Sequence, residues 1–247
     1  GIARMEDRYF QTNIIDFSET KHDKSTYSIF GGSIVLEGST LNARQFATQG
    51  SREKMAAQIF TGTEHFRSGA SKVTKDTPEP YKKVQSWLQV SYQNETYHKV
   101  SPKFTLGAYL EAYYSSRNFS NNYTATLMQA GEFTPTAHSK VTYNEAFRAN
   151  QYAGVGTMPI YQLSESFQLR GEFYGFIPIF PIKKDEYGQA YYGKAFTKFE
   201  YLGEISLVFQ LSFGSISAYV NHYSSPSNDW NVGLTLGWQL FNSRFVE

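Results

Sequence analysis

The chain has 247 residues, no cysteine and a formal net charge of +1, and 17% of its residues are aromatic. Its mean hydropathy of −0.46 excludes a membrane protein built from apolar helices, and its charge argues against a nucleic-acid partner, which requires a clustered positive surface. A chain that is polar on average but rich in aromatic side chains is typical of a β-barrel with an apolar outside and a wet inside.

Most of the sequence repeats one unit, in which a stretch of alternating polar and apolar residues is followed by a polar or Gly/Pro/Asn-rich turn. The pattern predicts strands near 25–37, 54–66, 83–98, 103–116, 122–130, 146–162, 164–177, 196–211, 215–223 and 230–241. Residues 9–17 are a candidate eleventh strand, and 141–147 a candidate separate one. We therefore expect an all-β fold, an antiparallel transmembrane β-barrel of about 10–12 strands that is complete or forms the C-terminal part of a larger barrel.

The alternation assigns opposite characters to the two faces of each predicted strand. In 167–177, Phe167, Leu169 and Phe173 share one face, while polar and charged residues share the other. Five polar residues in the middle of strands are predicted to face the lumen: Glu111, Gln168, Arg170, Glu172 and Glu204. A dry sandwich core would not accept so many charges cheaply, whereas a hydrated lumen would. Such residues could select solutes or hold a plug, or they could pair with one another to make the barrel rigid.

The connections between predicted strands fall into two sets. Residues 163–164 and 212–214 are tight turns, while 67–81, 131–140 and 183–195 are long and polar. Short periplasmic turns and long outer loops are expected of an outer-membrane barrel. The chain divides into 1–24, a lead-in or first strand, and 25–247, the barrel itself; no composition break marks another domain.

The last predicted strand carries a recognisable order of residue types. From Asn231 to Trp238 the sequence NVGLTLGW has a polar residue, then Gly233, then the apolar Leu236 and the aromatic Trp238. This order resembles the C-terminal β-signal that the outer-membrane insertion machinery reads by strand pairing. The alternative is that any amphipathic strand ending in aromatic residues matches so loose a pattern.

A second resemblance concerns the turn that follows the first long strand. The segments GSIVLEGSTLN (32–42) and QFATQG (45–50) resemble the strand–turn–strand unit of Omp85-superfamily barrels, and 133–139, 144–150 and 173–178 are similar to the C-terminal barrel of Bacteroidetes patatin-like proteins. The resemblance covers roughly 25–247 and implies a membrane barrel that follows an esterase domain and a periplasmic module. The Val-Arg-Gly-Phe/Tyr loop signature of Omp85 insertases is not found, so insertase or translocase activity is not implied.

Motifs for chemistry are scarce. No Gly-x-Ser-x-Gly nucleophile elbow occurs, and the five His are scattered without metal-binding spacing. His222 and Ser224 supply residue types for a lipid hydrolase on the barrel wall, but the following Ser-Ser-Pro-Ser-Asn-Asp is an ordinary turn composition. We expect no catalytic residue, no cofactor and no metal.

The leading hypothesis is an integral protein of the Gram-negative outer membrane, of the Omp85/patatin-linked type, which anchors or presents a partner domain without chemistry of its own. Its expected partners are outer-membrane lipids, the barrel-insertion machinery during biogenesis, and a fused or associated periplasmic or esterase domain. The alternatives are a small porin-like channel, a barrel-wall lipid hydrolase, and a soluble lipocalin-like or sandwich binding protein.

Overall fold

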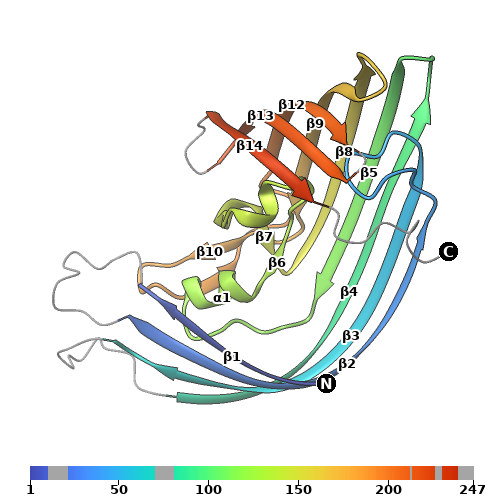
Figure 1. Cartoon of the computed structure of the whole chain (residues 1–247). Coiled ribbons are helices and arrows are strands. Elements are labelled where there is room, and N and C mark those ends of the chain that lie inside the picture. The colour runs from blue at the N-terminus through green and yellow to red at the C-terminus, as the bar shows by residue number, and fades with distance from the viewer. Residues whose placement is uncertain (11–21, 70–80, 212, 226–229, 239–247) are drawn as a thin grey trace.

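The computed structural model describes residues 1–10, 22–69, 81–211, 213–225 and 230–238. Its main element is a ten-stranded antiparallel sheet in which each strand pairs with its neighbours along the chain (Figure 1). The strands, in order, are β1 (Ile2–Tyr9), β2 (Asp23–Ser39), β3 (Gly50–Arg67), β4 (Tyr81–Lys99), β5 (Phe104–Ser115), β8 (Gln151–Gln162), β9 (Phe167–Pro178), β12 (Glu200–Leu211), β13 (Gly214–Tyr223) and β14 (Trp230–Trp238). The expected all-β antiparallel fold is confirmed.

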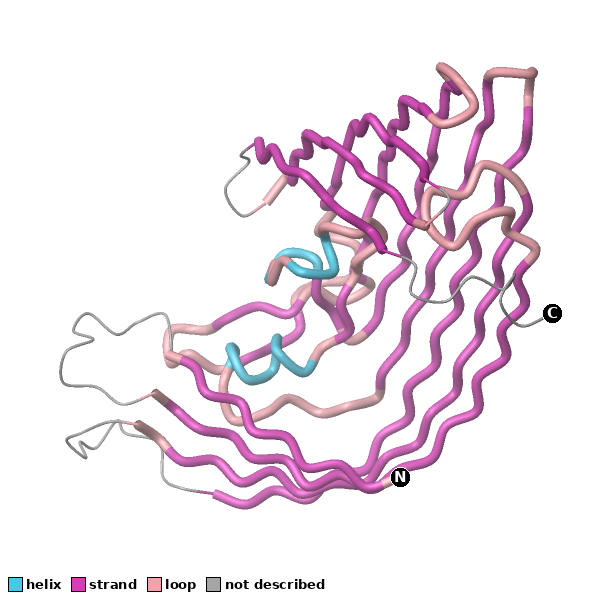
Figure 2. The backbone as a smooth tube through the Cα atoms, viewed as in Figure 1, coloured by secondary structure: helices cyan, strands magenta, loops and turns pink. Residues whose placement is uncertain are grey.

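The sheet curls into an arc whose concave side holds the remaining elements (Figures 1 and 2). These are α1 (Tyr123–Gln129), β6 (Gly131–Glu132), two 3-10 turns (Ser139–Val141 and Glu145–Phe147), β7 (Arg148–Ala149), β10 (Ile182–Lys184) and β11 (Ala190–Tyr192). Within the described ranges, β1 pairs only with β2 and β14 only with β13, so the arc is not closed by strand pairing. No helix in the described part of the chain is long and apolar enough to cross a membrane.

The connections at the two ends of the sheet differ in length, as the sequence predicts. At one end, residues 100–103 and 163–166 form tight turns, in which Val100 and Leu163 donate backbone hydrogen bonds to Phe104 and Phe167. At the other end, 116–150 and 179–199 are long. The prediction of 131–140 as an outer loop is wrong in its placement, because this stretch lies inside the arc and buries Phe133 and His138.

One predicted strand is a helix in the structure. Residues 122–130 form α1, because the Asn122 side chain accepts a hydrogen bond from the Ala125 backbone N–H and so caps a helix that buries Ala125 and Leu127. The alternation of Thr and apolar residues here resembles that of a strand. The predicted strand at 146–162 is likewise shorter, since it begins at Gln151 after the 3-10 turn Glu145–Phe147, and 141–147 forms no strand. Residues 11–17 of the candidate strand 9–17 lie outside the described residues.

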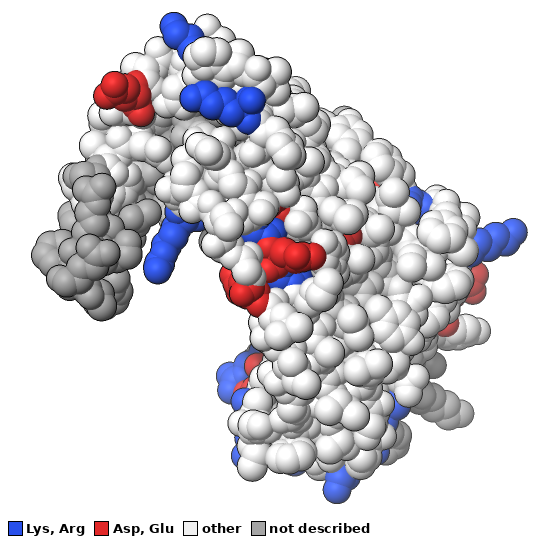
Figure 3. Space-filling view, turned by 90° about the vertical axis from the view of Figure 1, so that its right-hand side faces the viewer, with Lys and Arg blue, Asp and Glu red and all other residues white. Residues whose placement is uncertain are grey.

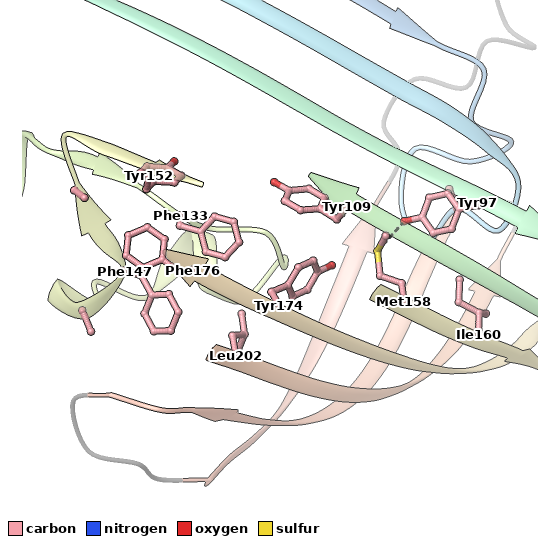
Figure 4. Packing of buried hydrophobic residues seen from close by; sticks show 13 residues of the cluster. Tyr97, Tyr109, Phe133, Phe147, Tyr152, Met158, Ile160, Tyr174, Phe176 and Leu202 are labelled. Atoms are coloured by element: carbon pink, nitrogen blue, oxygen red, sulfur yellow. Dashed lines mark hydrogen bonds between the residues drawn. The ribbon is translucent and has the colours of Figure 1, made fainter. Parts of the chain in front are cut away.

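The largest buried cluster lies between the concave face of the sheet and residues 116–150, which we call the interior segment (Figure 4). Phe133 of the interior segment lies within ring-contact distance of Tyr109, Tyr152, Tyr174 and Phe176 from three neighbouring strands. Burying aromatic rings against one another in this way adds edge-to-face and stacked contacts to ordinary hydrophobic burial. The aromatic composition of the chain therefore contributes to an interior core as well as to the outer face.

Candidate functional site

The interior segment, residues 116–150, crosses the concave side of the arc. Its side chains form hydrogen bonds with both the first and the last strand of the sheet. Near its start, Asn122 Nδ2 donates to Tyr9 Oη at 3.0 Å, and Gln129 Nε2 donates to Asp7 Oδ2 at 2.6 Å. Both acceptors belong to β1. Further along, His138 bonds to Thr235 of β14. One continuous stretch of chain thus joins the first and the last strand of the sheet.

Arg117 fixes the segment to the wall formed by β2–β4. Its guanidinium carbon lies 5.1 Å from the ring centre of Tyr27 and 4.6 Å from that of Trp87, and Nη1 donates to Gln129 at 2.7 Å. Such stacking of a weakly hydrated cation on aromatic faces is favourable when the group is desolvated. Burial lowers the pKa of the Arg117 guanidinium, while the neighbouring acidic groups oppose this shift.

Phe133 sits over a glycine of the wall. A Cβ placed on Gly154 in β8 would lie 2.1 Å from Phe133 Cε2. The ring therefore occupies the space that any side chain at position 154 would fill. This close approach places the middle of the interior segment directly on the sheet, with no gap between them.

His138 forms a second attachment, to β12 and β14. Its Nδ1 lies 2.8 Å from Glu204 Oε2, and its Nε2 lies 2.5 Å from Thr235 Oγ1. The imidazole also stacks on the ring of Tyr219 in β13. The histidine and the glutamate are both buried. Because a carboxylate only accepts hydrogen bonds, Nδ1 donates to Glu204, which leaves Nε2 as the nitrogen that faces the Thr235 hydroxyl.

The turn between β2 and β3, residues 40–49, folds inward at the short-turn end. Arg170 Nη1 donates to the Ala47 carbonyl at 2.9 Å, and Ser215 Oγ donates to Gln45 Oε1 at 2.9 Å. Gly50 closes the turn with φ +92°, and a Cβ there would lie 2.2 Å from the Thr40 carbonyl oxygen.

All five residues predicted to face the lumen lie on the concave side of the sheet, and Gln168, Arg170, Glu172 and Glu204 are buried. Arg170 Nε forms a short ion pair with Glu172 and Nη2 donates to Tyr97 at 2.6 Å. Glu111 accepts hydrogen bonds from Tyr109 and, at 2.6 Å, from Tyr152. The structure thus separates these charges into three places, with Arg170–Glu172 beneath the 40–49 turn, Glu111 among tyrosines, and Glu204 against His138.

The two residues considered for a wall hydrolase do not come together. His222 lies between Tyr201 and Trp230, with ring centres 5.8 and 4.8 Å away. Ser224 instead donates to Glu200 and caps the end of the β12–β13 pair through its backbone bond to Tyr201. Ser224 therefore has a structural role in the turn, in line with the turn composition.

The residues of the expected C-terminal signal lie on β14, which is an edge strand of the described sheet. Leu236 is on the convex face and 68% exposed, and Asn231 and Gly233 alternate with the apolar positions. A Cβ on Gly233 would lie 2.3 Å from Tyr219 Oη, so the glycine makes room for that tyrosine. The side chain of Trp238, and residues 239–241 of the predicted strand, lie outside the described part.

No pattern in the sequence singles out His138 or Thr235. The contacts of His138 with Glu204 and Thr235 span 66 and 97 positions of chain and arise from three separate elements, so no local spacing reveals them. Comparison of the chain with known protein families, curated proteins and solved structures found no match.

Proposed function

We propose that the chain forms the wall of an outer-membrane β-barrel, of the kind found in Omp85-superfamily and patatin-linked proteins, and that it acts as a membrane anchor with a filled interior. The observation that carries the proposal is the contrast between the two faces of the sheet. On the convex face, large apolar side chains at alternating positions are exposed in successive strands: Ile34, Leu36, Ile59, Leu88, Leu106, Leu110, Val155, Leu169, Phe173, Ile205, Leu207, Ile216, Val220, Val232, Leu234 and Leu236.

An exposed apolar surface that runs over nine neighbouring strands is far larger than the patches that soluble monomers tolerate. Figure 3 shows broad areas free of charged side chains on the side of the molecule that it presents. Lipid acyl chains would cover such a face, while buried charged groups of the concave face, such as Arg170 with Glu172 and Glu204 with His138, are paired inside. A soluble sandwich or lipocalin-like protein would require a second protein layer over the convex face.

Among the described residues, nothing pairs with the outer edges of β1 and β14, and this supports a larger wall. In hydrocarbon, every free backbone N–H and C=O costs several kcal/mol, on the order of the penalty for any unsatisfied buried polar group. The interior segment also lies between these two strands in Figure 1. We therefore propose that additional strands pair with β1 and β14 and complete the barrel.

The filled interior favours an anchor over the porin-like alternative. The 40–49 turn covers the short-turn end beside β9 and β13, and the interior segment packs directly on β5, β8 and β9. A water-filled pore would need this space.

Heat modifiability tests the membrane-barrel proposal. The purified chain, refolded in detergent, is compared on SDS gels with and without boiling. A folded barrel resists SDS and migrates differently from the boiled sample. If the chain is instead monodisperse without detergent, the membrane proposal fails.

A further inference from the structure

We propose that Thr235, His138 and Glu204 form an acyl-transfer site, with Thr235 as the nucleophile, His138 as the general base and Glu204 as the residue that orients the base. The substrate class is a carboxylic ester of a lipid. This proposal goes beyond the anchor function, and its lipid specificity rests on the membrane location proposed above.

The geometry matches the arrangement by which enzymes activate a hydroxyl. The hydroxyl, the imidazole and the carboxylate lie in series, with Oγ1–Nε2 at 2.5 Å and Nδ1–Oε2 at 2.8 Å. Hydrogen bonding to a base that a third group orients is the general signature of an activated nucleophile. Because His138 Nδ1 donates to the Glu204 carboxylate, Nε2 is left free to take the Thr235 proton.

The base is held rigidly. Thr136 and Ser139 exchange hydrogen bonds around His138, with Thr136 N to Ser139 Oγ at 2.9 Å and Ser139 N to Thr136 Oγ1 at 3.1 Å. The Thr142 hydroxyl donates to the His138 carbonyl, and Tyr219 covers one ring face. A fixed imidazole loses little entropy in the reaction, which is what a preorganised base requires.

An unpartnered polar group lies beside the nucleophile. Ser217 faces Thr235 directly across the β13–β14 pair, and it is 1% exposed. Among the described residues its hydroxyl has no hydrogen-bond partner, and neither has Asn221 Oδ1, opposite Glu204. A buried hydroxyl normally has a hydrogen-bond partner, which can be water, an ion or a bound group. Ser217 is therefore placed to donate to the oxyanion that forms when Thr235 attacks a carbonyl.

The position of Thr235 indicates which esters can reach it. Thr235 is half-buried on β14, and its side chain lies on the concave face beside Ser217, while its neighbours Leu234 and Leu236 point to the apolar convex face. Strand pairing uses backbone groups, so further strands beside β14 leave this side chain in place, and an ester group would approach it from the concave side.

The reaction would proceed in two balanced steps. Thr235 Oγ1 attacks the ester carbonyl carbon while His138 Nε2 takes the hydroxyl proton; the carbon–oxygen bond to the alcohol then breaks, and the alcohol leaves with that proton. Water attacks the acyl-threonine, transfers a proton through His138, and releases the carboxylic acid with Thr235 restored.

Hydrolysis of 4-nitrophenyl octanoate by the full chain in detergent micelles tests the proposal. We expect Thr235→Val and His138→Gln each to lower turnover by about 100-fold or more, and Thr235→Ser to retain most of it. Thr157→Val, which makes the same change on β8, is the matched control and should leave turnover unaltered. A fluorophosphonate probe should label wild type on Thr235, as located by mass spectrometry.

The same samples are checked for heat modifiability, which separates this proposal from the barrel proposal. Heat-modifiable wild type that turns over no faster than Thr235→Val would overturn the acyl-transfer site and leave the barrel intact. Labelling on a residue other than Thr235 would likewise contradict it. If the chain is soluble without detergent and its turnover depends on Thr235, the result would support the acyl-transfer site and contradict the membrane-anchor proposal.

Discussion

The Arg170 guanidinium in β9 donates to the Ala47 carbonyl at 2.9 Å, across 123 positions of chain. Because Arg170 also pairs with Glu172 and with Tyr97, it joins the 40–49 turn to the concave face through one buried cation. Charge-assisted bonds of this kind are about twice as strong as neutral ones.

Arg170→Met should release the turn and leave Glu172 as a buried charge without its partner. Removing one member of a buried ion pair costs about 3–5 kcal/mol, so the free energy of unfolding should fall by roughly that amount. Arg44 is exposed in the same turn, and trypsin should cleave after it faster in the variant. Arg52→Met, which breaks an exposed pair with Glu37, is the control. Equal cleavage rates in both variants would show that Arg170 does not hold the turn.

Gly50→Ala should destabilise the same turn through the backbone. The left-handed φ of Gly50 and the Thr40 carbonyl oxygen, 2.2 Å from the position of an added Cβ, both oppose a side chain there. The free energy of unfolding should fall by about 1–3 kcal/mol or more. The folded form should therefore lose its distinct migration on SDS gels at a lower temperature. Gly32→Ala is the matched control, because a Cβ at Gly32 meets nothing within 4 Å. An unchanged transition in Gly50→Ala would contradict the conformation described for the turn.

Phe133→Ala should loosen the interior segment from the wall. The ring is 1% exposed and contacts four aromatic rings, so its truncation should cost about 3–5 kcal/mol. Denaturant unfolding in detergent measures the loss. Val141→Ala, at an 85% exposed position of the same segment, should have little effect. If both variants behave alike, the segment is not packed on the sheet.

Replacement of 118–147 by a short Gly/Ser linker should open the interior. The Ser115 N–H donates to the Asn150 carbonyl at 2.6 Å, so β5 and β8 are already adjacent where the segment leaves and returns. In planar bilayers we expect no steady conductance from wild type and measurable conductance from the deletion. Equal conductance in both would favour the porin-like function.

The sequence predicts the strands well where side chains alternate between a polar and an apolar surface. In β12, Ile205, Leu207 and Phe209 must share one face, and this requirement fixes the opposite face for Glu204. The same reasoning does not apply to the interior segment. Its residues are buried on several sides, so α1 shows Thr and apolar residues in alternation although Asn122 caps a helix.

The candidate site could be predicted only in part. Glu204 is identifiable as an inward polar residue in the middle of a strand, and the structure places it there. His138 is in a loop whose polar composition predicts exposure, and Thr235 is one polar residue in an alternating strand. Their meeting depends on the path of the interior segment across the arc, which is tertiary information that no local pattern contains.

Contact of the convex face with lipid, on which the membrane proposal depends, is tested most directly by spin labelling, which is simple because the chain has no cysteine. A label on Leu207→Cys, on the convex face, is compared in lipid vesicles with a label on Lys194→Cys, in the connection between β11 and β12. We predict that the label at Leu207→Cys is accessible to molecular oxygen and shielded from a water-soluble nickel chelate, with the opposite preference at Lys194→Cys. Free access of the nickel chelate to Leu207→Cys would contradict lipid contact at this face.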